Sequence, residues 1–168
     1  RIEDTDKKRE VENGVETIIS VFKKFGLNFD EGALADGETG YYGPYRQRQR
    51  AAIYHVFAKK LVSEGKAYPC FCTEEELSSM REQQEAKGVN TGYYGEWALW
   101  RDRPIEDIEA ALAENKSWVL RFRSEGDPEK YIHLNDLVKG KIDMPENDQD
   151  IVLLKSDGIP TYHFAHVV

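Results

Sequence analysis

The apolar residues near the amino terminus repeat with the period of a helix. They fall on one face of a helix that starts near Val11 and that Gly26 would end. These apolar positions are Val15, Ile18, Ile19, Phe22 and Phe25. Thr5 or Asp6 could cap this helix. A second helix is expected from about Gln47 to Leu61, where apolar residues recur every fourth position.

The segment between these helices, Leu27 to Gly43, is rich in glycine and acidic residues and is expected to be a long loop. Unstructured loops of this length are uncommon in compact domains and are often functional. Three arginines follow it at the start of the second helix: Arg46, Arg48 and Arg50. Beside tyrosines they could hold a phosphate and stack on a base. The alternative, which the residues alone favour, is a solvated face that pairs with the acidic loop.

Short alternating patterns replace the longer ones after Lys66, which predicts a boundary there. The expected elements are a strand over 67–72, a helix capped by Thr73 and Glu76 and ended by Gly88, a helix beginning at Pro104, and strands over 118–123, 131–134 and 141–144. This middle section is therefore α+β, and it is predicted to interrupt an α/β sheet.

The last segment begins with an unbroken apolar run, Ile151 to Leu154. The run predicts a strand buried on both faces, as in a parallel sheet covered by helices, and we expect the same sheet to carry Arg1 to Glu3. A tyrosine and two histidines follow the strand, where open α/β sheets usually hold ligands. A capped strand with satisfied aromatic residues is the alternative. The fold class is predicted to be α/β.

Composition narrows the class of protein. The 168 residues are 40% hydrophobic and 32% charged, which is typical of a soluble globular protein. No apolar run is long enough to cross a bilayer, and the first residues do not resemble a signal peptide. The net charge of -8 argues against a generally basic nucleic-acid-coating protein, although a local patch could contact phosphates.

The two cysteines, Cys70 and Cys72, are separated by one residue. This spacing makes a disulfide between them unfavourable, and a reducing cytosol fits best. A structural zinc needs four ligands, and the sequence offers no other cysteine and no suitably spaced histidine. The sequence therefore predicts no metal site.

Four stretches resemble bacterial glutamyl-tRNA synthetases, in the order and at the spacing of that family. They are Arg1 to Asp6, Gly43 to Gln47, Lys66 to Cys72 and Leu153 to Ala165. The resemblance covers essentially the whole chain. It implies an internal fragment of a class I synthetase: a Rossmann-type catalytic domain over 1–67 and 151–168, interrupted by an α+β insertion over 68–150 that binds the tRNA acceptor stem.

The implied reaction has two steps. Glutamate is activated with ATP to glutamyl-adenylate, and the glutamyl group is then transferred to the 3′ end of tRNA(Glu). The parent enzyme would use ATP with Mg²⁺, and it is expected to be a cytoplasmic monomer with no membrane association. Zinc is not expected, because the family's zinc-binding members carry further ligands where this chain has Trp97 to Trp100.

The resemblance also implies roles for individual residues. Glu3 would receive the ammonium group of glutamate, Tyr162 would line the amino-acid pocket, and His166 would face it where asparagine is more usual. Thr5, Asp6 and Arg9 match positions near the terminal adenosine of the tRNA. Together with the three arginines at the start of the second helix, Arg46, Arg48 and Arg50, they are the predicted tRNA contacts.

In this family the phosphate charge is stabilised by a His-Ile-Gly-His segment and a Lys-Met-Ser-Lys-Ser-like loop. Neither occurs within the 168 residues, so the chain alone is expected to be inactive. Two other interpretations stay open: a relative that places glutamate on a modified tRNA base, and a non-catalytic module that binds the acceptor stem.

Overall fold

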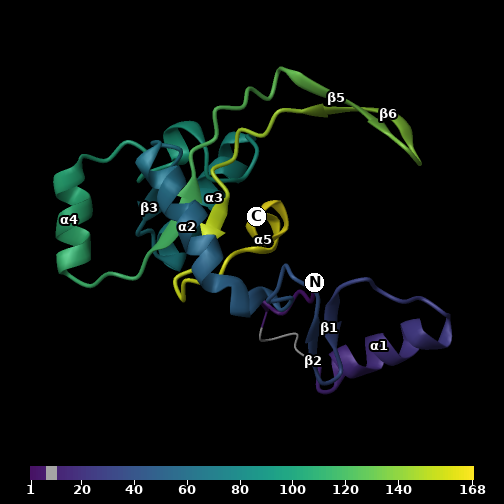
Figure 1. Cartoon of the computed structure of the whole chain (residues 1–168). Coiled ribbons are helices and arrows are strands. Elements are labelled where there is room, and N and C mark those ends of the chain that lie inside the picture. Colours follow the sequence, from purple (N-terminus) through teal and green to yellow (C-terminus); the bar gives the residue numbers. More distant parts are fainter. Residues whose placement is uncertain (7–10) are drawn as a thin grey trace.

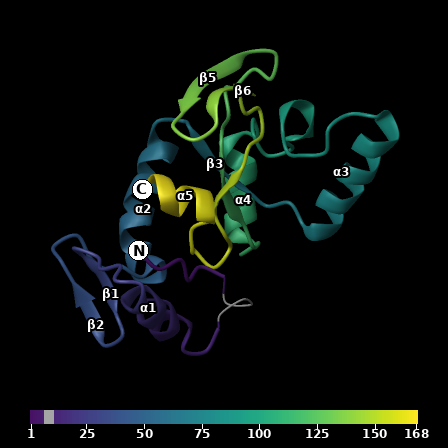
Figure 2. The same cartoon turned by 90° about the vertical axis from the view of Figure 1, so that its right-hand side faces the viewer.

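The computed structural model describes residues 1–6 and 11–168. A central region holds a three-stranded sheet, a hairpin projects from it, and a smaller unit contains the first helix (Figure 1). Helix α2 (Ala51–Ser63) runs between the smaller unit and the central sheet. The two ends of the chain lie near each other in both views (Figures 1 and 2).

The central sheet consists of β3 (Ala67–Cys70), β4 (Val119–Phe122) and β7 (Val152–Leu154), in the order β3-β4-β7. Both pairings are antiparallel, so the expectation of a parallel arrangement for β7 is wrong. The prediction that this sheet also carries Arg1 to Glu3 is wrong too, because Ile2 forms only an isolated parallel bridge with Arg46.

The prediction that β7 is buried on both faces is confirmed. Leu153 and Leu154 point to opposite faces of the strand and are 4% and 6% exposed. An apolar run predicts that a strand is buried on both faces, because other elements cover both faces of its sheet. The direction of the strand depends instead on how the chain connects it to its neighbours, and four apolar residues carry no information about that connection.

Successive residues of β3 point to opposite faces of the sheet and belong to two different hydrophobic clusters. Ala67 belongs to a cluster with α2 and β7, whereas Tyr68 and Cys70 belong to a second cluster on the other face. The first cluster contains Tyr54, Ala58, Ala67, Leu120, Leu153, Leu154, Phe164 and Ala165. The second contains Tyr68, Cys70, Met80, Tyr93 and Ala98. The sheet is therefore covered on both faces.

The smaller unit contains helix α1 (Gly14–Lys24) and a short antiparallel hairpin, β1 (Gly32–Leu34) and β2 (Gly37–Thr39). The predicted helix is confirmed, but its N-cap is Asn13 and not Thr5 or Asp6. The hairpin lies where the sequence predicted an unstructured loop. Three-residue strands with glycines at their ends give little alternating signal, which explains why the pattern was missed.

The remaining helices lie where they were predicted, except that the second, expected from about Gln47, is α-helical only from Ala51. A 3₁₀ turn, η2 (Gln47–Arg50), leads into α2, and η3 (Gly95–Trp97) lies between the later helices. Helix α3 (Glu74–Lys87) has the predicted capping box of Thr73 and Glu76, and Gly88 ends it with a φ of 67°. Helix α4 (Ile105–Ala113) starts directly after Pro104.

The last two predicted strands pair with each other. β5 (Tyr131–Asp136) and β6 (Gly140–Pro145) form an antiparallel hairpin that extends away from the central sheet (Figures 1 and 2). Helix α5 (Tyr162–Val167) follows β7. Among the described residues, no helix is both long and apolar enough to cross a membrane.

Candidate functional site

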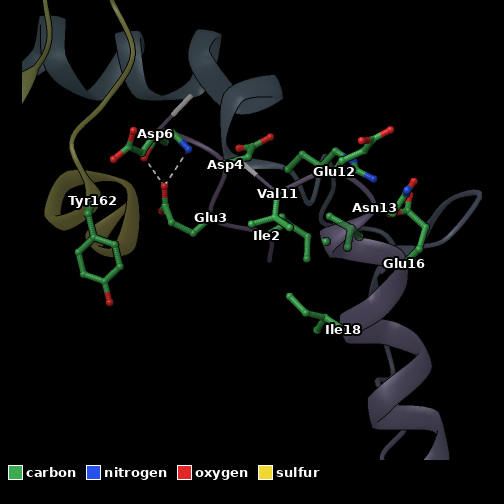
Figure 3. Close-up of a pocket in the computed structure, with 14 residues that line it drawn as sticks. Ile2, Glu3, Asp4, Asp6, Val11, Glu12, Asn13, Glu16, Ile18 and Tyr162 are labelled. Atoms are coloured by element: carbon green, nitrogen blue, oxygen red, sulfur yellow. Dashed lines mark hydrogen bonds between the residues drawn. The ribbon is translucent and has the colours of Figure 1, made fainter. Parts of the chain in front are cut away.

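A cavity of about 910 Å³ lies between the amino-terminal segment, the start of α1 and the first residue of α5 (Figure 3). Five of the residues singled out in the sequence line it: Glu3, Thr5, Asp6, Arg46 and Tyr162. They come from segments that are far apart in the chain. The fold therefore brings most of the predicted site together in one cavity.

Backbone hydrogen bonds fix the amino-terminal segment beside η2. The N–H of Ile2 donates to Tyr45 O at 2.7 Å, and the N–H of Gln47 donates to Ile2 O at 3.0 Å. Asp4 accepts a hydrogen bond from the N–H of Arg48 at 2.9 Å. Because Ile2 and Asp4 are held on either side of Glu3, the backbone of Glu3 is fixed next to the cavity.

The other wall is positioned by the turn after β7. The hydroxyl of Thr161 donates to Val152 O at 2.7 Å, and its N–H donates to Leu153 O at 2.8 Å. These bonds anchor the residue that precedes α5. Phe164 and Ala165 are buried within α5, which leaves Tyr162 half exposed toward the cavity.

The two oxygens of Glu3 have different surroundings. Oε1 accepts hydrogen bonds from the N–H of Thr5 at 3.1 Å and from the Thr5 hydroxyl. Oε2 lies 4.0 Å from Nδ1 of His166. The ring of His166 packs against that of Tyr162, with 4.1 Å between centroids and 34° between the ring planes. The three residues implied to bind glutamate therefore form one cluster.

The predicted arginines do not form a single group. Arg46 lines the cavity, whereas Arg50 uses Nη1 to donate to Tyr42 O at 3.1 Å and to Pro44 O at 3.0 Å. Arg48 is held through its backbone N–H and is partly buried. The first turn is a 3₁₀ helix, so the α-helical spacing that would align Arg46 with Arg50 does not apply. Arg9 lies outside the described residues.

Residues 1–168 match the family of tRNA synthetases class I (E and Q), catalytic domain. The chain belongs to this family. The prediction made from four short stretches is therefore confirmed for the family as a whole.

Several glutamate–tRNA ligases are similar to this synthetase chain. It is 58% identical to that of Acetivibrio thermocellus over 168 residues, covering 100% of this chain and 31% of the relative. It is 45% identical to that of Bacillus subtilis, covering 98% of this chain and 33% of the relative. The chain thus spans about a third of the length of these relatives.

A solved structure has a similar fold. The crystal structure of a glutamate tRNA ligase from Elizabethkingia meningosepticum in complex with its amino acid matches with a TM-score of 0.85 and 37% identity. The match covers 99% of this chain and 33% of that one.

The two cysteines, Cys70 and Cys72, both contact the hydroxyl of Tyr93. Both cysteines are free thiols, and their Sγ atoms lie 3.3 Å (Cys70) and 3.5 Å (Cys72) from Oη of Tyr93. The guanidinium of Arg121 lies 3.9 Å from the centre of the Tyr93 ring. A hydrogen bond with Cys72, followed by one with Tyr93, lowers the pKa of Cys70, while burial raises the pKa of the Tyr93 hydroxyl.

This donor set does not fit a structural zinc site. Only two thiols and a phenol are present, and the raised pKa of Tyr93 opposes the phenolate form that would bind a metal. Trp97 and Trp100 pack against the cluster and supply indole rings, which are not metal ligands. Within residues 1–6 and 11–168, no three His, Cys, Asp or Glu side chains form a metal-binding group.

A buried carboxylate that the sequence did not reveal joins the sheet to the loops around it. Asp150 is 1% exposed, and its oxygens accept hydrogen bonds from Tyr68 Oη, Arg101 Nη1 and the N–H of Ser124. Burial, followed by the hydrogen bond to Asp150, raises the pKa of Tyr68. The only sign of this hydrogen-bond network in the sequence is an aspartate directly before the apolar run of β7.

Proposed function

We propose that the protein carrying this chain is a glutamate–tRNA ligase. It would activate glutamate with ATP to glutamyl-adenylate and transfer the glutamyl group to the 3′ end of tRNA(Glu). The observation that carries this proposal is the cluster of Glu3, Tyr162 and His166 at the cavity of about 910 Å³. A carboxylate beside aromatic rings is suited to hold the ammonium group of an amino acid.

Within this proposal, Glu3 binds the ammonium group through Oε2, because Oε1 is already occupied by Thr5. Tyr162 forms the wall against which the aliphatic part of glutamate packs. Thr5 and Asp6, with Arg9, would lie near the terminal adenosine of the tRNA. Arg46 is the described cationic residue of the cavity, so it is the one best placed to meet a phosphate.

The chemistry depends mainly on positioning. The α-carboxylate of glutamate attacks the α-phosphate of ATP and expels pyrophosphate. The adenylate then passes its acyl group to a ribose hydroxyl of the tRNA and releases AMP. ATP would enter as its Mg²⁺ complex, as a substrate. In this proposal the described residues Glu3 and Tyr162 hold the amino acid in place.

We also propose the division into a catalytic part, 1–67 and 151–168, and an acceptor-stem insertion, 68–150. The two hydrophobic clusters support two packing units, because every residue of the second lies within 68–150 and every residue of the first except Leu120 lies outside that range. The boundary would then cross the sheet itself, because β3 and β4 pair within the same sheet as β7. We further expect a monomer without zinc, located in the cytoplasm, where free thiols such as Cys70 stay reduced.

The test is glutamate-dependent charging of tRNA(Glu) by the full-length protein. Glu3→Gln removes the negative charge and keeps an oxygen for Thr5. Since a charge-assisted hydrogen bond contributes about 1.5–3 kcal/mol, the KM for glutamate should rise about 10- to 150-fold. Glu109→Gln, the same change at an exposed position of α4, should leave the KM within about twofold. Equal effects of the two variants would contradict the role of Glu3, and an inactive wild-type protein would contradict the proposed function.

A further inference from the structure

We infer that Lys155 is a positioning residue for the amino acid: its ammonium group holds the backbone of Thr5, which in turn orients the carboxylate of Glu3 toward the substrate. The inference rests on the proposed role of Glu3 in binding the ammonium group of glutamate. It deepens that role by adding a residue that acts on the amino acid only through Thr5 and Glu3.

The contact that carries the inference joins two residues 150 positions apart. Nζ of Lys155 donates a hydrogen bond of 2.8 Å to Thr5 O. Lys155 follows β7 directly, in the turn that leads to Tyr162, whereas Thr5 belongs to the amino-terminal segment. These two segments form opposite walls of the cavity of about 910 Å³. Because the donor is charged, the bond is stronger than one between two neutral groups, and it ties one wall to the other.

Thr5 is held on both sides of the donors that it offers to Glu3. Its carbonyl oxygen accepts the bond from Lys155, and the residue before it, Asp4, accepts a hydrogen bond of 2.9 Å from the N–H of Arg48. Thr5 is 8% exposed, and both its N–H and its hydroxyl donate to Oε1 of Glu3 (Figure 3). Since these donors hold Oε1, their position decides where Oε2 points. Lys155 therefore acts on the oxygen that is left for the substrate.

Lys155 reaches Thr5 from outside the amino-acid cavity. Among the described residues that line this cavity, Glu3 and Thr5 are present and Lys155 is not. Lys155 lines a second cavity, of about 420 Å³, together with residues of α2 that include Lys59. Its ammonium group is thus placed to act through the backbone of Thr5, and not to contact a molecule bound beside Glu3.

The turn that carries Lys155 is itself fixed. The N–H of Lys155 donates to Ile159 O at 2.9 Å, and the N–H of Gly158 donates to Lys155 O at 2.9 Å. Nε2 of His55, on α2, donates to Gly158 O at 2.8 Å. The backbone of Lys155 is therefore anchored to a helix, as a residue that positions others requires.

The experiment is a double-mutant cycle of Lys155→Met and Glu3→Gln, measured by glutamate-dependent charging of tRNA(Glu) with the full-length protein. Lys155→Met keeps an unbranched side chain and removes the ammonium group. The KM for glutamate should rise about tenfold, at the lower end of what a charge-assisted hydrogen bond contributes. The kcat and the KM for ATP should stay within about twofold, because Glu3 holds the amino acid equally before and during the reaction. In the Glu3→Gln background, where the charge is already absent, Lys155→Met should raise the KM by less than about twofold.

Lys59→Met is the matched control. Lys59 is exposed on α2 and lines the same second cavity, so this change removes an equal charge at that cavity. It should leave the KM for glutamate within about twofold of wild type, as surface substitutions usually do. A rise as large as that of Lys155→Met would assign the effect to the charge of the cavity and overturn the inference.

An unchanged KM for glutamate in Lys155→Met would also overturn the inference, as would a fall in kcat alone, which is what a loss of folded enzyme produces. A raised KM for ATP would mean that Lys155 meets a phosphate, and an equal rise in the Glu3→Gln background would mean that it does not act through Glu3. Either result contradicts the inference. In all these cases charging continues, so the proposed function stands. An inactive wild-type protein would instead overturn the proposed function, and this inference with it.

Discussion

The hydroxyl of Tyr68 donates a hydrogen bond of 2.5 Å to the buried carboxylate of Asp150. Tyr68 belongs to β3, and Asp150 directly precedes β7, so the bond spans the sheet across β4. Arg101 adds an ion pair of 2.9 Å to the same carboxylate. The entry of β7, which leads to Tyr162 and His166, is therefore tied to the strand on the far side of the sheet.

Asp150→Asn should destabilise the protein by about 3 kcal/mol, because it leaves the partly buried charge of Arg101 without its partner. The matched control is Asp102→Asn. It removes an ion pair with Arg123 in which the aspartate side chain is 79% exposed, and it should cost less than about 1 kcal/mol. Thermal unfolding of both full-length variants measures the difference. A similar loss of stability in both variants would mean that the hydrogen bonds around Asp150 are not a main anchor of the sheet.

Thr73→Ala should weaken the start of α3. The Thr73 hydroxyl accepts a hydrogen bond from the N–H of Glu76, and the Glu76 side chain accepts one from the N–H of Thr73. Loss of such a cap costs about 1 kcal/mol. Hydrogen exchange of the first turn of α3 should speed up, whereas Thr73→Ser, which keeps the hydroxyl, should leave the exchange rates close to those of wild type.

The sequence predicted features whose cause is local. The capping box, the glycine after α3 and the apolar stripe of α1 each depend on residues within a few positions of one another. The direction of β7 was predicted wrongly because it depends on β4, about thirty positions earlier, which fixes the antiparallel register of Leu120 with Leu154. Local patterns carry little information about such pairings.

The candidate site was predictable only in part. Glu3 and His166 stand at opposite ends of the chain, so no spacing rule could bring them together, and only the family resemblance named both. The pairing of His166 with Glu3 and the node at Asp150 required the fold. For the arginines the prediction was wrong: helical spacing grouped Arg46 with Arg50, but Arg50 donates to the carbonyls of Tyr42 and Pro44.

The pKa of Glu31 should depend on Tyr45. A hydrogen bond from the Tyr45 hydroxyl is the main cause that lowers this pKa from the ordinary value of 4.5. A carboxylate with a lowered pKa stabilises the fold above its ordinary value, and this contribution is lost as the pH falls through the lowered one. The attachment of the β1–β2 hairpin to Tyr45 should therefore weaken below about pH 4.5.

Tyr45→Phe removes the hydroxyl and should move the pKa of Glu31 upward, which an NMR titration of that carboxyl can follow. Tyr41→Phe is the control. Tyr41 donates to Glu31 through its backbone N–H and its side chain is 98% exposed, so this change should have no effect. A shift of equal size in both variants would contradict the assignment to the Tyr45 hydroxyl.

The purified full-length protein should contain no stoichiometric zinc. Cys70 and Cys72 converge on the hydroxyl of Tyr93, and tryptophans occupy the neighbouring positions. Two thiols leave a tetrahedral site incomplete. Elemental analysis after dialysis checks this directly. About one zinc per chain that is lost in Cys70→Ser would show that the cluster binds metal after all.

Residues 1–168 expressed alone should not charge tRNA. The described part of the cavity contains one cationic residue, Arg46, among the carboxylates Glu3, Asp4, Asp6, Glu12 and Glu16. Such a surface repels a nucleoside triphosphate, because Arg46 is outweighed by five carboxylates. Glutamate-dependent charging by this chain should equal that of a sample without protein, beside an active full-length control. Turnover above that background would contradict the expectation.

The same isolated chain is expected to keep weak, salt-sensitive affinity for tRNA through Arg46. Each phosphate that is neutralised adds about -0.9 to the slope of log K against log salt on duplex nucleic acid, so Arg46→Ala should flatten the slope by about that amount. Arg50→Ala is a poorer probe, because Arg50 holds the carbonyls of Tyr42 and Pro44 and its loss would also disturb the loop. Arg81→Ala, the same change on the exposed face of α3, is the control and should leave the slope unchanged. Filter binding at increasing salt measures the tRNA affinity of the wild-type chain, Arg46→Ala and Arg81→Ala. Binding that does not weaken with salt would rule out phosphate contacts, and equal slopes for Arg46→Ala and wild type would place those contacts elsewhere.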